Sequence, residues 1–297
     1  IVRSLSVMIG LLSIVALYAL TRQLFDAQVG LFSAFLLAIS PLHIWYSQEA
    51  RMYILVAALG LCSAYFMLLA LQHGRPWHWL AYVLSMAMAM SAHYFAIFLV
   101  PFQNVYMLYL IWRKKVRIGI WKRWLLSQVI IALLSAIGLA GIFSSETTYW
   151  WGLLDTWHGA PTWRDLVGTL FSFSLGNTAE GPLLYTAGLL IFGFCATWSV
   201  IDWTGRRFSL SLEDGLVFAL LYLGVPLGTI FLLSQFQSVW VLRYIFLFLP
   251  AWCIIVARGI SRMPGRVLRP LLGGAIVLAS LWSIANIYRY EQKENWR

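Results

Sequence analysis

The sequence predicts an all-α fold: a polytopic transmembrane helical bundle of about ten spans, with a partly helical outer loop. Of its 297 residues, 61% are hydrophobic and only 11% are charged, whereas about 25% of an average soluble domain is charged. A soluble domain of this length buries only about 75% of its surface, so it could not remove this much apolar area from water. The apolar runs are continuous rather than alternating, which favours helices over a transmembrane barrel.

Ten apolar runs are candidate spans, because a hydrocarbon core about 30 Å thick needs about 20 residues of helix. They cover residues 4–20, 28–42, 52–71, 77–91, 94–112, 124–143, 183–201, 215–234, 244–260 and 268–285. The short run 77–91 is followed almost at once by the next, which predicts a helical hairpin with a tight turn near His93. The stretch 166–175 is too short to span and predicts an interfacial or re-entrant helix. Trp and Tyr residues near the predicted boundaries, such as Trp45 and Tyr46, are typical of an aromatic belt.

The distribution of basic residues predicts an orientation. If residue 1 lies outside and the spans alternate, fourteen of the 21 Lys and Arg fall in inner loops, and the basic run 113–123 is the strongest anchor. The net charge of +10 therefore indicates contact with membrane lipids, not with nucleic acid. We expect one transmembrane domain over residues 1–297, with the outer loop 144–182 inserted between spans.

Both ends of the sequence look truncated. The first residue is Ile rather than Met, and the last four, Glu294 to Arg297, stop within polar sequence. We expect an interior piece of a longer protein.

The densest group of polar residues at a predicted membrane boundary runs from Ser40 to Tyr53. Pro41 ends one span and Arg51 begins the next. A carboxylate and a guanidinium beside hydrocarbon are costly unless they are paired or functional. The segment is therefore either a salt-bridged, headgroup-anchoring loop or an anion site. In an anion site, Arg51 would bind a phosphate with two parallel hydrogen bonds, and Glu49 would be an acid, a base or an orienting group.

Two further outer positions are candidates. Arg243, followed by Tyr244, begins the span 244–260 and either reaches the headgroups or faces Arg51 as a second phosphate ligand. His93 is either a hydrogen-bonded structural residue or part of the site. The His and acidic residues show no spacing typical of metal ligands, so we predict no cofactor and keep a divalent metal as an alternative.

The stretch Arg3 to Tyr53 resembles the glycosyltransferase C superfamily, in particular bacterial proteins grouped with the dolichyl-phosphate-mannose protein mannosyltransferases. The specific pieces are Ser40-Pro41 and Ser47-Gln48-Glu49-Ala50-Arg51-Met52-Tyr53. Other landmarks that resemble the family are Arg3, Leu20-Thr21-Arg22, Leu42-His43, His93-Tyr94-Phe95, Arg243-Tyr244 and Pro250.

The resemblance implies a multi-pass enzyme of the bacterial inner membrane and cell envelope. Such an enzyme moves a sugar, with inversion, from a polyprenyl-phosphate donor to a lipid, glycan or protein acceptor on the non-cytoplasmic face. The resemblance also implies a catalytic role for Glu49, and substrate binding by Arg51, Tyr53, His93, Arg243 and Tyr244.

In this family the principal acidic motif precedes the helix that begins here at Arg3. The resemblance therefore implies a fragment that lacks the first helix and the first outer loop, with the catalytic acidic motif outside this chain. Two alternatives stay open. One is a polyprenyl-linked glycan polymerase or ligase, and the other is a non-catalytic membrane subunit or transporter that retains the scaffold.

Overall fold

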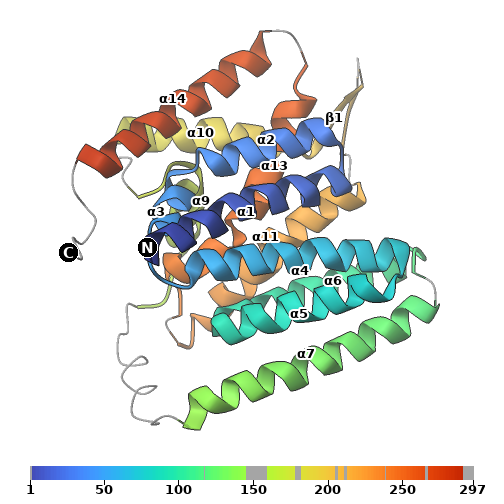
Figure 1. Cartoon of the computed structure of the whole chain (residues 1–297). Coiled ribbons are helices and arrows are strands. Elements are labelled where there is room, and N and C mark those ends of the chain that lie inside the picture. The colour runs from blue at the N-terminus through green and yellow to red at the C-terminus, as the bar shows by residue number, and fades with distance from the viewer. Residues whose placement is uncertain are drawn as a thin grey trace. The chain divides into compact units, whose positions relative to one another are not determined.

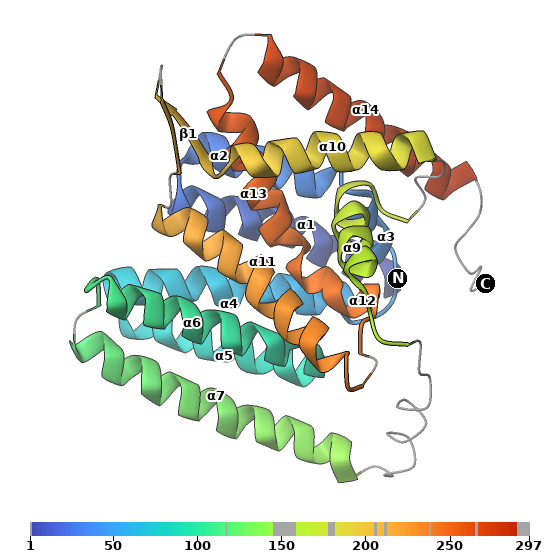
Figure 2. The ribbon, with the colours of Figure 1, turned by 180° about the vertical axis from the view of Figure 1, so that it is seen from behind.

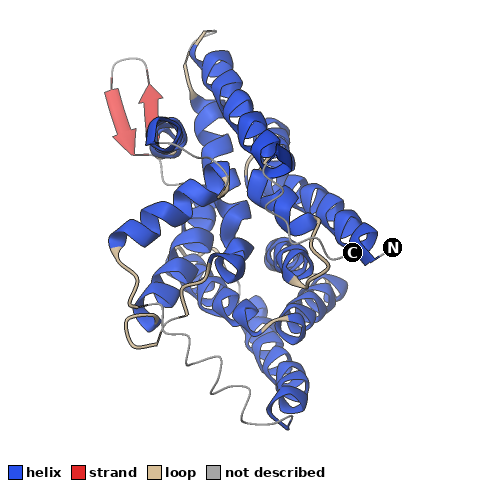
Figure 3. Ribbon diagram, turned by 90° about the vertical axis from the view of Figure 1, so that its left-hand side faces the viewer, coloured by secondary structure: helices blue, strands red, loops and turns tan. Residues whose placement is uncertain are grey.

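The structure, a computed structural model, describes residues 2–116, 118–144, 159–177, 182–204, 207–210, 213–237, 239–264 and 267–289. These residues are almost entirely helical (Figures 1 and 3). They form two compact units. The first unit comprises Ile1–Arg51, Trp163–Leu220 and Leu249–Arg297, and the second comprises Met52–Thr162 and Leu221–Phe248. The expectation of a single transmembrane domain stays a prediction.

The first unit contains most of the long apolar helices from the two ends of the chain. Its helices are α1 (Val2–Leu24), α2 (Ala27–Ala38), α3 (Pro41–Ser47), α9 (Trp163–Leu175), α10 (Pro182–Trp198), the start of α11 (Asp214–Leu233), α13 (Leu249–Arg262) and α14 (Leu268–Arg289). α2 packs on both α1 and α13, and α10 packs on α13 and α14 (Figure 2). α9 confirms a helix where the sequence predicted a short one at 166–175. The rest of the predicted outer loop lies mostly outside the described residues.

Two residues of the local sequence, Ser40 and Pro41, account for the break between α2 and α3. Ser40 caps α3, because its Oγ accepts a hydrogen bond from the backbone N–H of His43 at 3.4 Å. Pro41 occupies the first turn of α3, where its missing N–H costs nothing. The two helices are bent by 63°, so the predicted span 28–42 is two helices rather than one.

Close helix approach in the first unit depends on a small residue. A Cβ built on Gly259 of α13 would overlap the carbonyl oxygen of Cys195 in α10 and lie 2.7 Å from the carbonyl carbon. Small residues at such contacts let helix backbones pack tightly within a membrane. The α10–α13 contact therefore requires glycine at this position.

Arg258, the residue directly before Gly259, is one of the fourteen basic residues that the sequence places in inner loops, but the structure buries it in α13. It is only 1% exposed. Its Nη1 donates to the Ser199 carbonyl oxygen, and its Nη2 lies 3.2 Å from Oε2 of Glu213. The Glu213 carboxylate also pairs with Arg262. A buried guanidinium needs such partners, since an uncompensated buried charge is strongly destabilising.

A short β-hairpin lies between α10 and α11 within the all-α fold. Strands β1 (Ile201–Thr204) and β2 (Arg207–Leu210) pair antiparallel, with Ile201 opposite Leu210 and Thr204 opposite Arg207 (Figure 3). The sequence between α10 and α11 alternates apolar and polar residues and has only two residues between the strands, a pattern that favours a hairpin over a plain loop.

The second unit is a bundle tied together by buried polar side chains. Its elements are α4 (Tyr53–His73), α5 (Pro76–Ala92), η1 (Tyr94–Phe98), α6 (Leu99–Trp112), α7 (Ile118–Ser144), the end of α11, α12 (Leu242–Ile245) and η2 (Phe246–Phe248). α5 packs between α4 and α7 (Figure 1). The Tyr82 hydroxyl donates to Gln103 at 2.8 Å and accepts from Gln128 at 2.9 Å, and Gln103 donates to Ser63 at 2.9 Å. One chain of hydrogen bonds therefore links four helices.

The number of spans is smaller than the sequence predicted. A helix lies at each of the ten predicted positions. In the part of the chain that the structure describes, however, six helical segments are long and apolar enough to cross a membrane, or seven if α2 and α3 form one bent span. The expectation of about ten is corrected because some of the helices at these positions are too short to count as spans. Pro76 and His93 confine α5 to 17 residues, and α2 has only 12.

We expect Gly259→Ala to destabilise the protein by about 1–3 kcal/mol, the usual cost of forcing extra atoms into a tight contact. Gly193→Ala in α10 is the matched control, since a Cβ at Gly193 meets nothing within 4 Å. Thermal unfolding of the purified protein in detergent measures both. Equal melting temperatures for the two variants would contradict the close approach of α10 and α13.

Candidate functional site

The polar residues Gln48, Glu49 and Arg51 directly follow α3, a short helix that is fixed against α1 in the first unit. His43 Nε2 lies 2.9 Å from the Ser13 Oγ of α1. The Ser47 Oγ donates to the His43 carbonyl at 2.7 Å and occupies the space that a Cβ on Gly10 would need. These contacts fix α3 against α1, so the residues that follow it start from a defined position.

Glu49 is held by a tryptophan rather than by an arginine. The Trp45 indole Nε1–H donates to Glu49 Oε1 at 3.0 Å. Glu49 Oε2 is buried and has no hydrogen-bond partner among the described residues. Arg51 is exposed, and the described ion pairs do not include one between Glu49 and Arg51. The Trp45 indole thus fixes one of the two carboxylate oxygens.

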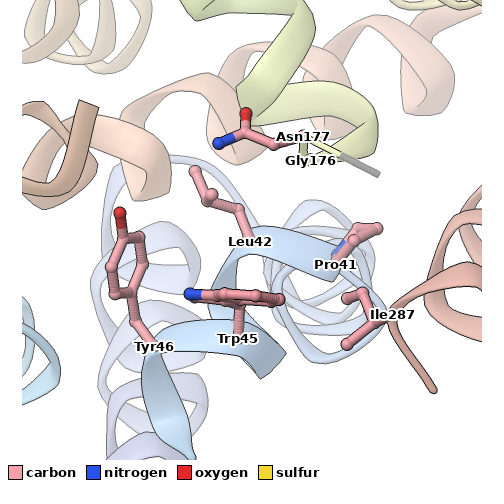
Figure 4. A pocket seen from close by; sticks show the side chains of 7 residues that line it. All are labelled: Pro41, Leu42, Trp45, Tyr46, Gly176, Asn177 and Ile287. Atoms are coloured by element: carbon pink, nitrogen blue, oxygen red, sulfur yellow. The ribbon is translucent and has the colours of Figure 1, made fainter. Parts of the chain in front are cut away.

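A pocket of about 240 Å³ opens beside Trp45 (Figure 4). Its walls come from α3 (Pro41, Leu42, Trp45, Tyr46), from Gly176 and Asn177 after α9, and from Ile287 of α14. The volume is many times the roughly 10–15 Å³ that one water needs, so the pocket has room for a small organic group. Its lining combines aromatic faces with one exposed amide.

Gly176 makes this pocket possible. It has φ of +70°, which disfavours residues with a side chain. A Cβ there would lie 2.9 Å from Cβ of Pro41. The chain after α9 therefore turns directly over the start of α3, and this turn places Asn177 at the pocket.

The second unit gathers four of the six predicted site residues. Tyr53 begins α4, His93 ends α5, and Arg243 and Tyr244 lie on α12. The Tyr53 and His93 ring centroids are 6.0 Å apart, and those of His93 and Tyr244 are 4.9 Å apart. The guanidinium carbon of Arg243 lies 5.0 Å from the Tyr244 ring centroid, within cation–π range. The cavity among these side chains is only about 10 Å³, room for about one water.

His93 in this cluster is a neutral imidazole. Burial, and secondarily the Arg243 guanidinium, lower the pKa of His93 to about 4. The backbone N–H of Phe95 donates to His93 Nδ1 at 3.1 Å, so the ring proton is on Nε2. At neutral pH the cluster therefore carries one positive charge, on Arg243, and His93 supplies a neutral N–H donor.

The structure thus places Tyr53, His93, Arg243 and Tyr244 together in the second unit, and Glu49 and Arg51 beyond α3 in the first. The predicted approach of Arg51 to Arg243 stays a prediction. In the part of the chain that the structure describes, no three His, Cys, Asp or Glu residues are grouped so as to hold a metal ion.

Sequence reasoning did not select three side chains that the fold places near the motif. Trp45 and Tyr46 were read as an aromatic belt, although Trp45 lies four residues before Glu49, the spacing of neighbours on a helix. Asn177 carries no local signal, since it meets α3 only through the tertiary fold. A further polar tie, from Gln48 Nε2 to the Tyr288 hydroxyl at 2.6 Å, joins residues 240 positions apart.

Comparison with known families confirms the resemblance in the sequence. Residues 1–142 match the family described as dolichyl-phosphate-mannose-protein mannosyltransferase. The match covers just under half of the chain. The protein is a multi-pass integral membrane protein. No curated protein matches the chain in sequence.

Solved structures share the fold. ArnT from Cupriavidus metallidurans matches in its apo state, with a TM-score of 0.62 and 18% identity, and bound to undecaprenyl phosphate, with a TM-score of 0.59 and 19% identity. Both matches cover 99% of this chain, and 51% and 52% of ArnT. The chain therefore spans about half the length of these relatives. An Archaeoglobus fulgidus oligosaccharyltransferase matches with a TM-score of 0.45 and 14% identity, over 96% of this chain and 43% of its own.

The lowered pKa of His93 predicts that acid weakens the fold. An unfolded imidazole has a pKa of about 6.5, so on acidification the unfolded state takes up the proton before the folded state does. Stability is then lost as the pH falls from about 7 towards 4. The groups packed around His93 are Tyr53, Tyr94, Tyr244 and Arg243.

We expect the melting temperature of the wild-type protein to be lower at pH 5 than at pH 7, and this difference to shrink in His93→Asn, whose amide oxygen can still accept the Phe95 N–H. The measurement is thermal unfolding in detergent at the two pH values. The same decrease in both proteins would show that His93 is not the group responsible.

Proposed function

We propose that this protein is a membrane glycosyltransferase that moves a sugar from a polyprenyl-phosphate donor to an acceptor on the non-cytoplasmic face of the membrane. The observation that carries the proposal is the family match over residues 1–142, which include the segment from Ser40 to Tyr53. The shared fold with a protein that was solved with undecaprenyl phosphate supports a donor of this kind.

The proposed chemistry is an inverting displacement. An acceptor hydroxyl attacks the anomeric carbon, the bond from that carbon to the phosphate oxygen breaks, and the polyprenyl phosphate leaves with the electron pair. The hydroxyl proton passes to a base. Negative charge grows on the departing phosphate, so preplaced cations stabilise the transition state. Arg51 and Arg243 take this role, because a guanidinium offers a planar pair of donors to phosphate oxygens.

The aromatic cluster in the second unit supports Arg243 in this role. The Tyr244 ring lies beside the guanidinium, and Tyr53 and His93 pack on Tyr244. Because the cavity among them holds about one water, the phosphate binds at the surface of the cluster. Neutral His93 then offers its Nε2–H to a phosphate oxygen without a second positive charge beside Arg243.

The pocket beside Trp45 is the proposed place for a sugar ring. The faces of aromatic rings suit apolar faces of sugars, and the Asn177 amide offers both a donor and an acceptor to hydroxyl groups. Glu49 acts here as a positioning residue, since its Oε1 fixes the indole of Trp45. In the alternative mechanism, its Oε2 would take the hydroxyl proton as the general base.

The phosphate role of the two arginines predicts a large loss of turnover. Arg51→Ala or Arg243→Ala should each reduce sugar transfer by about 10²–10³, the scale of one lost transition-state donor. Arg51→Lys should recover only part, because an ammonium cannot form the paired hydrogen bonds. The assay is transfer from a labelled polyprenyl-phosphate sugar in membranes with equal expression of each variant.

Arg164→Ala is the control for these variants. Arg164 is exposed on α9, beside Trp163, and is also predicted to be outside. It should keep wild-type activity. Wild-type activity in both Arg51→Ala and Arg243→Ala would show that these arginines only contact lipid headgroups.

Glu49→Gln separates positioning from base catalysis. The Gln carbonyl oxygen can still accept the Trp45 N–H. If Glu49 only positions Trp45, the variant should therefore lose little turnover, about tenfold, and the loss should be independent of pH. Trp45→Phe, which removes the donor, should lose a similar amount, whereas Trp282→Phe on the exposed face of α14 should lose little. General-base catalysis is typically worth about 10²–10⁴. A loss above about 10³ in Glu49→Gln, with disappearance of the acid limb of the pH–rate profile, would make Glu49 the base.

A further inference from the structure

A groove of about 390 Å³ runs along one side of α14 in the first unit. We call it the α14 groove. Phe35 of α2, Ile260 of α13, and Gly273, Gly274 and Val277 of α14 contribute to its walls. Its volume falls within the range of about 300–1,000 Å³ that is typical of ligand sites. Apart from one arginine, every residue that lines it is apolar.

That arginine is Arg269, which lies in the first turn of α14. Its Nη2 donates to the carbonyl oxygens of Ser261 at 2.7 Å and Met263 at 3.1 Å, so the guanidinium is fixed against the end of α13. Its Nε is buried and has no hydrogen-bond partner among the described residues. The groove therefore has one fixed cation at one end, with an unsatisfied donor.

The length of the groove matches one leaflet of a membrane. From Arg269 to Val277 the helix rises by about 12 Å, whereas half of a hydrocarbon core about 30 Å thick is about 15 Å. The ligand that suits a cation followed by an apolar channel of this length is a lipid with a negatively charged headgroup. Exposed large side chains on the same helix, such as Leu271 and Leu278, place α14 against lipid.

We propose that the α14 groove binds an anionic phospholipid from the leaflet on the side of the α13–α14 connection. One acyl chain lies along Gly273 and Gly274, and the headgroup phosphate binds Arg269. The charge distribution of the chain predicts that this connection is cytoplasmic, opposite to the face predicted for Arg51 and Arg243. A membrane phospholipid is therefore favoured over the donor lipid of the proposed transfer reaction.

Gly274→Leu tests the groove without disturbing the backbone. A Cβ at Gly274 meets nothing within 4 Å, so a larger side chain would fill the space where the acyl chain lies. Gly193→Leu on α10 is the matched control, because a Cβ at Gly193 is equally unobstructed and lies outside the groove. Arg269→Gln removes the charge at the headgroup end.

The measurement is native mass spectrometry of the protein purified in detergent and titrated with dioleoyl-phosphatidylglycerol or dioleoyl-phosphatidylcholine. We expect the wild-type protein to retain one phosphatidylglycerol, and Gly274→Leu and Arg269→Gln to bind it about tenfold more weakly. Gly193→Leu should bind it as the wild type does. Phosphatidylcholine should bind the wild type more weakly than phosphatidylglycerol.

Three results would overturn the proposal: unchanged binding in Gly274→Leu, equal retention of the two phospholipids, or displacement of phosphatidylglycerol by an equal concentration of undecaprenyl phosphate. Arg269 also supports the end of α13, so thermal unfolding of Arg269→Gln is measured in parallel. If that variant is unfolded, Gly274→Leu decides the matter. None of these measurements uses sugar transfer, so they are independent of the proposed enzyme activity.

Discussion

Within hydrocarbon, every backbone N–H and C=O must find its partner inside the chain, and the rest of this structure follows from that constraint. Helices satisfy it segment by segment, which is why the long apolar runs are helical. Hydrophobic burial adds little to helix association there, because lipid tails are as apolar as the side chains. Tight packing and polar ties take over that role. In the second unit Tyr82, Gln103 and Ser63 form such a tie, and in the first unit Gly259 permits the backbone contact.

The same constraint explains where polar chemistry gathers. Irregular backbone is costly in lipid, so it lies where side chains supply the missing hydrogen bonds. At the α2–α3 break Ser40 caps the new helix, and at the end of α5 the ring of His93 accepts the Phe95 N–H. These two breaks carry Trp45 and Glu49 in one unit and the Arg243 cluster in the other.

Arginines in this chain have three different surroundings, although composition treats them as one class. Arg258 is buried and paired with Glu213, so it belongs to the core. Arg269 is fixed by carbonyl oxygens at one end of an apolar groove. Arg51 is exposed. Only the positions of neighbouring carbonyls, carboxylates and cavities separate structural support from ligand binding, and these positions depend on helices distant in sequence.

The sequence by itself determined the helical membrane fold, the positions of the apolar helices, the end of a helix at Pro41 and the resemblance of residues 1–142 to a known family. These features are local: hydropathy, helix capping and short motifs act over a few turns. The tertiary structure decided that Trp45, not Arg51, holds Glu49, that Asn177 reaches the pocket, and that Tyr53, His93 and Tyr244 cluster with Arg243. It also reduced the spans to six or seven among the described residues. Such facts depend on which helix faces meet, and side-chain contacts between segments up to 240 residues apart leave no periodic signal in the sequence.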